Sequence, residues 1–348
     1  MPTVSIDGIV TRYEVTGSGP PLLMFSPGGF DATLDNWTAH GSYRRLNLLG
    51  HLTRRYTCIA FDKRESGRSG GRVERVTWAH YAAQGKGLLD HLGVERAHLM
   101  GGCVGCSIAA VFALAHPETT ISMVLYSPAG GARYRVTQHA RFAQHLAYLD
   151  EHGLEQVVAL ANSHDKSFSQ DPRVGPWASV IRADQAFAEA YAQQDTGSYR
   201  YLVTGMARVL FDRDTVPGPE PEDLLRLPVP ALVVPGQDAS HATSAARYLQ
   251  ECLPQAEYWD VPVAEQTEQT APPRVLEFLD AVPMAQARSP WHRRSWGVRG
   301  GERAPPPNET GTRAKITPPK GSRNTARANS RPAPAPRSGR GAAGDGRP

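Results

Sequence analysis

The sequence predicts an α/β protein whose mostly parallel central sheet is covered by helices on both faces. Short apolar, β-branched runs alternate along the chain with segments that repeat apolar residues every three or four positions. The strand-like runs are apolar throughout, which is typical of parallel strands buried on both faces. They also end in clusters of Gly, Ser and Asp, at the edge where such sheets carry their functional residues.

The first part of the chain alternates regularly between strand and helix patterns. Residues 3–16 predict a β-hairpin, and residues 21–25, 56–62, 96–100 and the run from Ile121 predict buried strands. Helices are expected at about 78–92, ending at Gly93, and at 106–116, ending before Pro117. After residue 215 the alternation resumes, with strands at 229–238 and 256–262 and helices at 244–253 and 271–282.

Between these two parts, residues 134–215 contain helical patterns and no strand-like run. We therefore expect a helical cap (134–215) inserted into a core made of residues 1–133 and 216–284. Two histidines of this segment, His139 and His145, are expected to be solvated or to cap helices. Residues 285–348 contain 10 Pro and 9 Gly and leave little to bury, so they are predicted to form a disordered basic tail.

Charge and composition exclude several classes of function. The chain carries a net charge of +4, but residues 285–348 hold 14 Lys and Arg against 3 Asp and Glu, so the first 284 residues carry about −7. This balance gives no basis for specific nucleic-acid binding by the folded part. No apolar run reaches the roughly 18 residues of a membrane helix, and four scattered cysteines form no disulfide framework. We expect a cytoplasmic protein with free thiols and no membrane insertion.

The stretch GGCVGC, residues 101–106, supports two interpretations. Cys103 and Cys106 have the C-x-x-C spacing of a dithiol redox pair or of half a zinc site. Gly101 and Gly105 give Cys103 the surroundings of a nucleophile in a sharp strand-to-helix turn, where small residues let strand and helix approach. The strand before it and the helix after it favour the turn, and no second Cys or His pair completes a zinc site. A Cys103–Cys106 disulfide remains as a hypothesis for oxidative inactivation.

With these features the chain resembles the α/β-hydrolase family over about residues 3–282. PGGFD (27–31) stands where the family has its oxyanion loop, and FDKRESGRS (61–69) stands where it commonly has D-x-R-G-x-G-x-S. GGCVG (101–105) matches the nucleophile turn, and VPALVVPGQD (229–238) matches the strand that delivers the acid. Members with a cysteine nucleophile, such as dienelactone hydrolases, carry the same G-x-C-x-G pattern.

The resemblance implies that Cys103 is the nucleophile. Its place at the first turn of a helix favours the thiolate, because unpaired N–H groups and the helix dipole stabilise negative charge there. The N–H of Val104 and one from Gly28, Gly29 or Phe30 would form the oxyanion hole. No metal and no organic cofactor are implied.

The resemblance also implies an acid and a base. Asp238, just after a predicted strand, matches the region of the acid. The family places a histidine base after its last strand, but Gln266 stands at that position. Three residues are candidates to replace the base: His241, three positions after Asp238; Glu265; and Glu65, which would pair with Cys103. We expect His241 to be the base.

The expected activity is hydrolysis of a small ester, lactone, thioester or related carbonyl compound through an acyl-enzyme on Cys103. A thiol needs less assistance than a hydroxyl, because a few per cent of it is already ionised near neutral pH. Two alternatives use the same fold: a protein that binds a ligand or partner without turnover, and an acyltransferase that uses Cys103. A small molecule is the expected partner, and the sequence predicts no oligomeric state.

Overall fold

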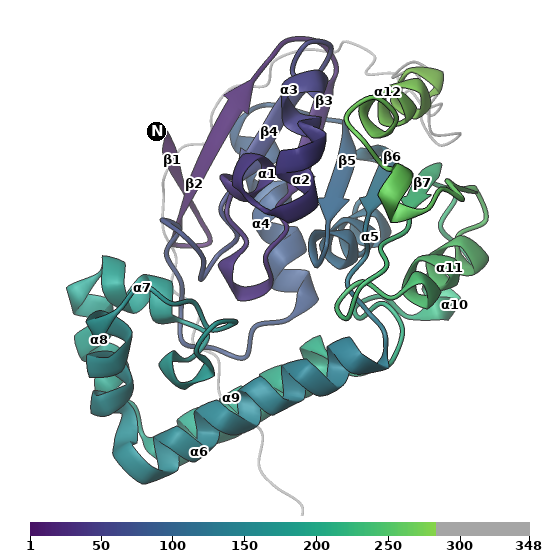
Figure 1. Cartoon of the computed structure of the whole chain (residues 1–348). Coiled ribbons are helices and arrows are strands. Elements are labelled where there is room, and N and C mark those ends of the chain that lie inside the picture. The colour runs from purple at the N-terminus through teal and green to yellow at the C-terminus, as the bar shows by residue number, and fades with distance from the viewer. Residues whose placement is uncertain (283–348) are drawn as a thin grey trace, which may run out of the picture. The chain divides into compact units, whose positions relative to one another are not determined.

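A computed structural model describes residues 1–282. Its strands form one sheet in the order β1-β2-β4-β3-β5-β6-β7-β8 (Figure 1). β1 (Thr3–Ile6) and β2 (Ile9–Thr16) form the predicted hairpin, and β2 pairs antiparallel with β4. All later neighbours in the sheet are parallel, which confirms the predicted mostly parallel sheet. The remaining strands are β3 (Pro21–Phe25), β4 (Thr57–Phe61), β5 (Ala97–Gly102), β6 (Thr120–Tyr126), β7 (Ala231–Val234) and β8 (Ala256–Tyr258).

The sheet buries apolar side chains on both faces because successive residues of a strand point to opposite sides. In β3, Leu23 and Phe25 pack into one apolar cluster, whereas Leu22 and Met24 pack into a second. The first cluster includes residues of α4 (Trp78–His91), α5 (Gly105–Ala115), α10 (Pro221–Leu224) and α11 (Thr243–Cys252). The second includes residues of α1 (Asn36–Ala39), α2 (Gly41–Leu46), α3 (Leu48–Leu52) and α12 (Ala271–Ala281).

Three short helices were not predicted from the sequence. α1, α2 and α3 fill the connection between β3 and β4, and their buried residues pack on the sheet. Each spans at most 6 residues, which is too short to show a helical period in the sequence. α1 matters for function because it begins beside the loop that follows β3.

A helical insertion, defined here as α6–α9, separates β6 from β7. Its helices are α6 (Ala132–Ser163), α7 (Ala178–Ala183), α8 (Gln185–Ala192) and α9 (Thr196–Leu210). No strand lies between β6 and β7 in this described part of the chain, in agreement with the helical patterns of its sequence. α6 is interrupted at Gly153, whose φ is +78°. Part of α6 packs alongside α9 (Figure 1).

The predicted organisation of the chain includes a separate cap and a disordered tail. A separate cap with boundaries at 134 and 215 remains a prediction, although the helical insertion falls almost wholly inside that range. The predicted disordered tail, 285–348, and the last residues of the predicted core lie outside the described residues. Within residues 1–282, no helix has both the length and the apolarity needed to cross a bilayer.

Candidate active site

Cys103 lies in a tight turn between β5 and α5. Its φ is +55°, in the left-handed region that residues other than glycine rarely adopt. A Cβ on Gly101 would lie 2.4 Å from the carbonyl oxygen of Gly105. A Cβ on Gly105 would lie 2.1 Å from the carbonyl oxygen of Phe25. Both positions therefore require glycine if the strand and the helix are to approach this closely, which is the geometry that the G-x-C-x-G pattern predicts.

Two backbone N–H groups, those of Gly28 and Val104, lower the pKa of the Cys103 thiol. Gly28 lies in the loop after β3, and Val104 directly follows the cysteine. Of the three loop residues expected from the sequence, Gly28 is the one whose N–H acts on the thiol, whereas Gly29 and Phe30 continue into a short 3-10 turn. The two donors that would form an oxyanion hole thus both act on the Cys103 sulfur.

Asn36, the first residue of α1, closes the loop that carries Gly28. Its side-chain amide donates to the carbonyl oxygens of Pro27 and Asp31, both at 2.7 Å. Gly28 has a φ of +126°, and a Cβ there would lie 2.5 Å from the amide nitrogen of Asn36. Sequence reasoning missed Asn36, because an asparagine at a helix start is normally interpreted as a cap.

His241 lies in the loop after β7, and its Nδ1 is 2.9 Å from both carboxylate oxygens of Asp238. The same carboxylate accepts from the backbone N–H groups of Ser240 and His241, at 2.8 and 3.0 Å. It therefore fixes both the loop and the imidazole. The other ring nitrogen, Nε2, is buried and has no hydrogen bond of standard geometry within residues 1–282. Because Nδ1 faces Asp238, Nε2 is the atom through which His241 interacts with Cys103.

Cys103 and His241 shift each other's affinity for protons. Burial alone would raise the pKa of the Cys103 thiol, but His241 and the two backbone N–H groups outweigh it and hold this pKa below its usual value. Burial alone would lower the pKa of His241, but Cys103 and Asp238 outweigh it and raise this pKa to about 9. Each side chain of the pair therefore stabilises the charged form of the other.

The segment after β6 connects the nucleophile turn to the histidine loop. The N–H of Ala129 donates to the carbonyl oxygen of Cys103 at 3.2 Å, and that of Gly130 donates to Ser240 at 2.9 Å. The N–H of Ala242 donates back to the carbonyl oxygen of Gly130 at 3.3 Å. Backbone hydrogen bonds thus fix how the loop after β7 lies against the turn after β5.

Gln266, at the position where the family resemblance implies a histidine, is buried. Its amide oxygen accepts from the hydroxyl of Tyr126 at 2.9 Å. Its amide nitrogen donates to the carbonyl oxygens of Pro235 and Val261, at 2.9 and 3.2 Å. These bonds join the end of β6 to the segments after β7 and β8, so the side chain has a structural role.

Neither alternative base contacts Cys103 through a hydrogen bond or ion pair in the described part of the chain. Glu265 is exposed at the end of a short 3-10 turn, Val263–Glu265. Glu65 is buried with a φ of +63°, and its Oε1 accepts from Nε of Arg64 at 2.7 Å. The structure thus brings His241, and not these carboxylates, to the cysteine.

Cys106 packs beneath the turn. Its sulfur donates to the carbonyl oxygens of Gly101 and Tyr126, at 3.2 and 3.5 Å, and burial raises the pKa of its thiol. All four cysteines are free thiols: Cys58, Cys103, Cys106 and Cys252. Within residues 1–282, no group of three or more His, Cys, Asp or Glu side chains is arranged to hold a metal ion.

Aromatic side chains gather where the helical insertion meets the loop after β3. The ring of Phe30 makes edge contacts with those of Phe142 and Phe168, at centroid distances of 5.6 and 5.1 Å. Tyr134, near the start of α6, is buried close enough to Cys103 for its pKa to respond to the thiol, although burial is the larger cause of its increase. Sequence reasoning missed this wall, because such residues have the same pattern as an ordinary apolar core.

The expectation that His145 is solvated or a helix cap was wrong. It is fully buried in the helical insertion, with Nδ1 3.2 Å from the carbonyl oxygen of Arg173 and Nε2 2.7 Å from the hydroxyl of Tyr199. Burial lowers its pKa to about 4. His139 is half-buried, with Nε2 2.9 Å from the carbonyl oxygen of Phe211. Both rings therefore satisfy polar groups within the insertion.

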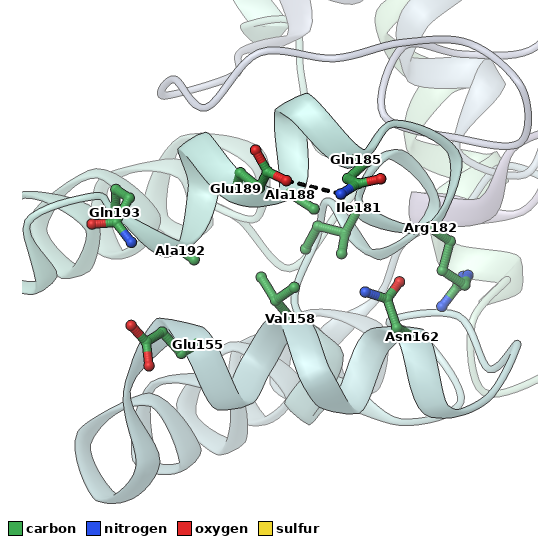
Figure 2. A pocket seen from close by; sticks show the side chains of 10 residues that line it. All are labelled: Glu155, Val158, Asn162, Ile181, Arg182, Gln185, Ala188, Glu189, Ala192 and Gln193. Carbon is green, nitrogen blue, oxygen red and sulfur yellow. Dashed lines mark hydrogen bonds between the residues drawn. The ribbon is translucent and has the colours of Figure 1, made fainter.

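A pocket of about 790 Å³ lies within the helical insertion, between the second half of α6 and helices α7 and α8 (Figure 2). Val158 and Ile181 contribute apolar surface to it. Polar side chains surround these two, and Nε2 of Gln185 donates to Glu189 at 2.9 Å. None of the candidate site residues lines this pocket, so it shares no side chain with the centre around Cys103.

The sequence was compared with known families and proteins. Residues 21–167 match the model of the α/β hydrolase fold family. A 2-hydroxy-6-oxo-6-phenylhexa-2,4-dienoate hydrolase of Comamonas testosteroni is 49% identical over 126 residues, which cover 36% of this chain and 42% of that protein. The dihydrolipoyllysine-residue acetyltransferase component of an acetoin cleaving system of Cupriavidus necator is 34% identical over 125 residues, which cover 36% and 31%. The matched segments thus span less than half of each of these relatives.

Solved structures match over a larger part of the chain. The enol-lactonase from Burkholderia xenovorans LB400 has a TM-score of 0.52 at 19% identity, covering 80% of this chain and 100% of its own. A hydrolase from Pseudomonas aeruginosa PA01 has a TM-score of 0.53 at 23% identity, covering 80% and 97%. At these identities the likeness concerns the fold. The chain has the α/β-hydrolase fold, as the resemblance in its sequence implied.

Proposed function

We propose that the protein is a cysteine-dependent hydrolase that cleaves a small ester, lactone, thioester or related carbonyl compound through an acyl-enzyme on Cys103. The observation that carries this proposal is the convergence of His241 and the N–H groups of Gly28 and Val104 on the sulfur. An activated thiolate, a proton donor and two oxyanion donors are the groups that acyl transfer through a thiol requires.

In the first half of the reaction, the Cys103 thiolate attacks the carbonyl carbon and the C=O electron pair moves to the oxygen. The N–H groups of Gly28 and Val104, which lower the pKa of the thiol in the free protein, then donate to this oxyanion. As the tetrahedral intermediate collapses, the imidazolium of His241 gives its Nε2 proton to the leaving group. The product of this half is a thioester on Cys103 and a neutral imidazole.

In the second half, neutral His241 accepts a proton from a water molecule that attacks the thioester carbonyl. The second tetrahedral intermediate collapses to the free acid, and the leaving sulfur again becomes a thiolate beside an imidazolium. Asp238 accepts from Nδ1 throughout, which holds the ring in place and stabilises its positive charge. The acid, Asp238, and the base, His241, thus come from one loop. Gln266, which lies after β8, has a structural role instead.

The relatives support a carbonyl substrate of small size. Those matched by sequence and by structure include proteins named as a dienoate hydrolase and an enol-lactonase. One relative is named as an acetyltransferase component. Transfer of the acyl group from Cys103 to an acceptor other than water is therefore the second candidate, since it requires the same first half-reaction.

The proposal is tested by incubating the protein with a panel of 4-nitrophenyl esters, lactones and thioesters, followed by intact-protein mass and turnover measurements. We expect an acyl adduct on the wild type and on Cys252→Ala, a control thiol outside the site, and none on Cys103→Ala. His241→Ala is expected to lower turnover by about 100-fold, the scale of general acid–base catalysis. The absence of any adduct, with equal background rates for wild type and Cys103→Ala, would overturn the proposal and leave a binding protein without turnover as the alternative.

Hydrolysis and acyl transfer are distinguished by the products. With alcohols, amines and thiols added as acceptors, a hydrolase releases mainly the free acid, whereas an acyltransferase releases mainly the acylated acceptor. The ratio of these two products as the acceptor concentration rises assigns the reaction. A ratio that strongly favours one acceptor over water would replace the hydrolase assignment by the transferase.

A further inference from the structure

Lys63, two residues after β4, is a buried ammonium outside the Cys103–His241–Asp238 group. The residue is 4% exposed. Its Nζ lies 4.2 Å from the ring centroid of Tyr81 and 5.4 Å from that of Phe30. It donates one hydrogen bond, to the carbonyl oxygen of Arg64 at 3.1 Å. An ammonium has three N–H donors, so this contact uses one of them.

The carboxylates near Lys63 are engaged elsewhere. Oε1 of Glu65 accepts from Arg64 at 2.7 Å, and Arg64 also pairs with Glu74. Asp31 acts on Lys63 only over a longer distance. In the described part of the chain, no carboxylate lies within 4.0 Å of Nζ. Lys63 is therefore a buried cation with no direct counter-ion.

A second polar atom at this place also has no partner. Oε2 of Glu65 is buried and makes no hydrogen bond within residues 1–282. Buried polar atoms are nearly always hydrogen-bonded, and buried charges are nearly always paired. Two unused N–H donors on Lys63 and one unused acceptor on Glu65 thus mark a place where a polar group from outside the chain would bind.

Two aromatic side chains place Lys63 near the catalytic cysteine. Phe30, one of the two rings beside Nζ, follows Gly28 by two residues, and the backbone of Gly28 lowers the pKa of the Cys103 thiol. Tyr81, the other ring, is buried near Tyr134, whose pKa in turn responds to Cys103. The ammonium therefore lies beside aromatic side chains that border the site.

We propose that Lys63 is a substrate-binding residue whose ammonium binds a carboxylate group of the substrate, so that the protein selects acidic carbonyl substrates over neutral ones of the same size. This inference rests on the proposed function and names the substrate class of the same site. The carboxylate accepts from the unused N–H groups, and the aromatic rings contact the apolar part of the substrate next to it. The charge-assisted hydrogen bond forms in a place from which water is largely excluded, where such bonds are strong.

The local charges disfavour a doubly charged group. Lys63 and Arg64 carry two positive charges, whereas Glu65, Glu74 and the more distant Asp31 are carboxyl groups. A phosphate dianion would add two negative charges to this group, and a carboxylate adds one. Because the Glu65 carboxylate lies nearby, a dianion is repelled more strongly than a monoanion.

The test compares two esters of one length, 4-nitrophenyl hydrogen glutarate and its neutral methyl ester. The measured quantity is the ratio of their kcat/KM values. We expect Lys63→Met to lower this ratio by about 30-fold or more, the scale for removing one partner of a buried charged hydrogen bond. Lys86→Met, a control on α4 whose ammonium pairs with Asp90 at the surface, leaves the ratio unchanged. An unchanged ratio in folded Lys63→Met would overturn the proposal.

A second measurement uses the wild type and remains informative if Lys63→Met does not fold. Burial lowers the pKa of Lys63 to about 8, so the ratio should fall as the pH rises through this value. Both esters require the Cys103–His241 pair, whose titration cancels in the ratio. The other titratable groups that face Lys63 are Glu65 and Asp31, and Tyr81 on α4. A ratio that is constant from pH 6 to pH 10 would contradict the assignment.

A binding experiment separates this inference from the proposed function. Calorimetry with monomethyl glutarate on Cys103→Ala reports carboxylate binding without turnover. Binding that is lost in Cys103→Ala/Lys63→Met supports the carboxylate site even if the wild type hydrolyses no ester. Equal binding to both variants, or none to either, would show that Lys63 does not bind the carboxylate, and would overturn the inference while leaving acylation of Cys103 unaffected.

Discussion

The Cβ that Gly236 lacks would lie 2.4 Å from the Cβ of His241. Real Cβ atoms essentially never have neighbours closer than 3.0 Å, so the backbone of His241 lies where only glycine leaves room. The imidazole itself is held by Asp238 through Nδ1. The loop after β7 is therefore packed as one unit, and the position of the ring depends on a residue that makes no polar contact with it.

We predict that Gly236→Ala lowers kcat/KM by about 100-fold, because displacement of a catalytic group by about 1 Å has effects of this size. The new methyl group meets the Cβ and the backbone of His241, which cannot rotate away as a flexible side chain would. Gly197→Ala on α9 is the control, since its Cβ would have Asp195 at an ordinary 3.4 Å. Ester hydrolysis and thermal unfolding of both variants check this. A fully active Gly236→Ala would show that the loop moves freely.

The pairing of Cys103 with His241 predicts how the reactivity of the thiol depends on pH. Because the pKa of Cys103 lies below its usual value, alkylation by iodoacetamide should stay fast at a lower pH than for an ordinary thiol, and slow as the pH falls through this lowered pKa. His241→Ala removes the imidazolium, which raises the pKa of the thiol and moves the profile to higher pH. Above about pH 9 the wild type loses its imidazolium proton, so hydrolysis falls while alkylation does not.

The measurement is the alkylation rate of Cys103 between pH 5 and pH 10, followed by intact mass. Cys103→Ala corrects for the other thiols. Asp238→Asn shows how much of the lowering of the Cys103 pKa depends on the support that Asp238 gives to the charge of His241. Superimposable profiles for the wild type and His241→Ala would contradict an interaction between the two side chains.

The fold and part of the site could be predicted because the signals are local. Gly101 and Gly105 surround Cys103 within five residues, and their spacing, with a strand before and a helix after, predicts the turn. His241 lies three residues from Asp238, so its loop could be proposed as the source of the base. What the sequence could not show depends on contacts between distant segments, such as the bonds that Gln266 makes to Tyr126 and two carbonyl groups.

One physical reason explains why the sequence did not predict the burial of His145 or the surroundings of Asn36 and Lys63. The sequence around His145 has the ordinary spacing of an amphipathic helix. Only the packing of the helical insertion determines that the His145 ring is buried. The side chain of Asn36 donates to two backbone carbonyl groups of the loop after β3, and backbone contacts of this kind leave no pattern in the residue types. For Lys63, the motif after β4 predicts a turn, but the surroundings of the ammonium follow from Phe30 and Tyr81, which come from other elements.

Asn36 is predicted to position the Gly28 N–H. Asn36→Ala removes two hydrogen bonds that close the loop, so the donor is no longer aimed at the oxyanion. We expect kcat to fall by about 10- to 100-fold, with KM changed less, because this donor acts mainly in the transition state. The alkylation profile of Cys103 should also move to higher pH, since the Gly28 N–H helps to lower the pKa of the thiol.

Asn162→Ala, on the exposed surface of α6, is the matched control and should change neither quantity. Steady-state kinetics with one ester and alkylation rates on the same preparations provide the comparison. If Asn36→Ala unfolds more easily but keeps its kcat and its alkylation profile, Asn36 contributes only to stability.

Gln266 and Tyr126 are predicted to be coupled in stability. Gln266→Leu leaves the Tyr126 hydroxyl and two carbonyl groups buried without a partner, and should reduce the free energy of unfolding by about 2–4 kcal/mol. Tyr126→Phe should cost less in the Gln266→Leu background than in the wild type, because the hydroxyl has already lost its acceptor. Denaturant unfolding of the two single variants and the double variant measures this coupling. Strictly additive losses would mean that the hydroxyl finds another partner.

His145 predicts a loss of stability in acid. Its pKa is about 4 in the folded protein and about 6.5 in an unfolded chain, so between these values the unfolded state binds more protons. The free energy of unfolding should therefore fall as the pH is lowered from 6.5 to 4, by about 3 kcal/mol from this group. His145→Gln removes its titration and should reduce the slope of this part of the stability profile, leaving the contribution of His98, whose pKa burial also lowers to about 4. His152→Gln, a partly exposed histidine on the same helix, should leave the slope as in the wild type. Denaturant unfolding at half-unit steps of pH measures the slopes, and a wild-type slope in His145→Gln would mean that other buried groups cause the acid sensitivity.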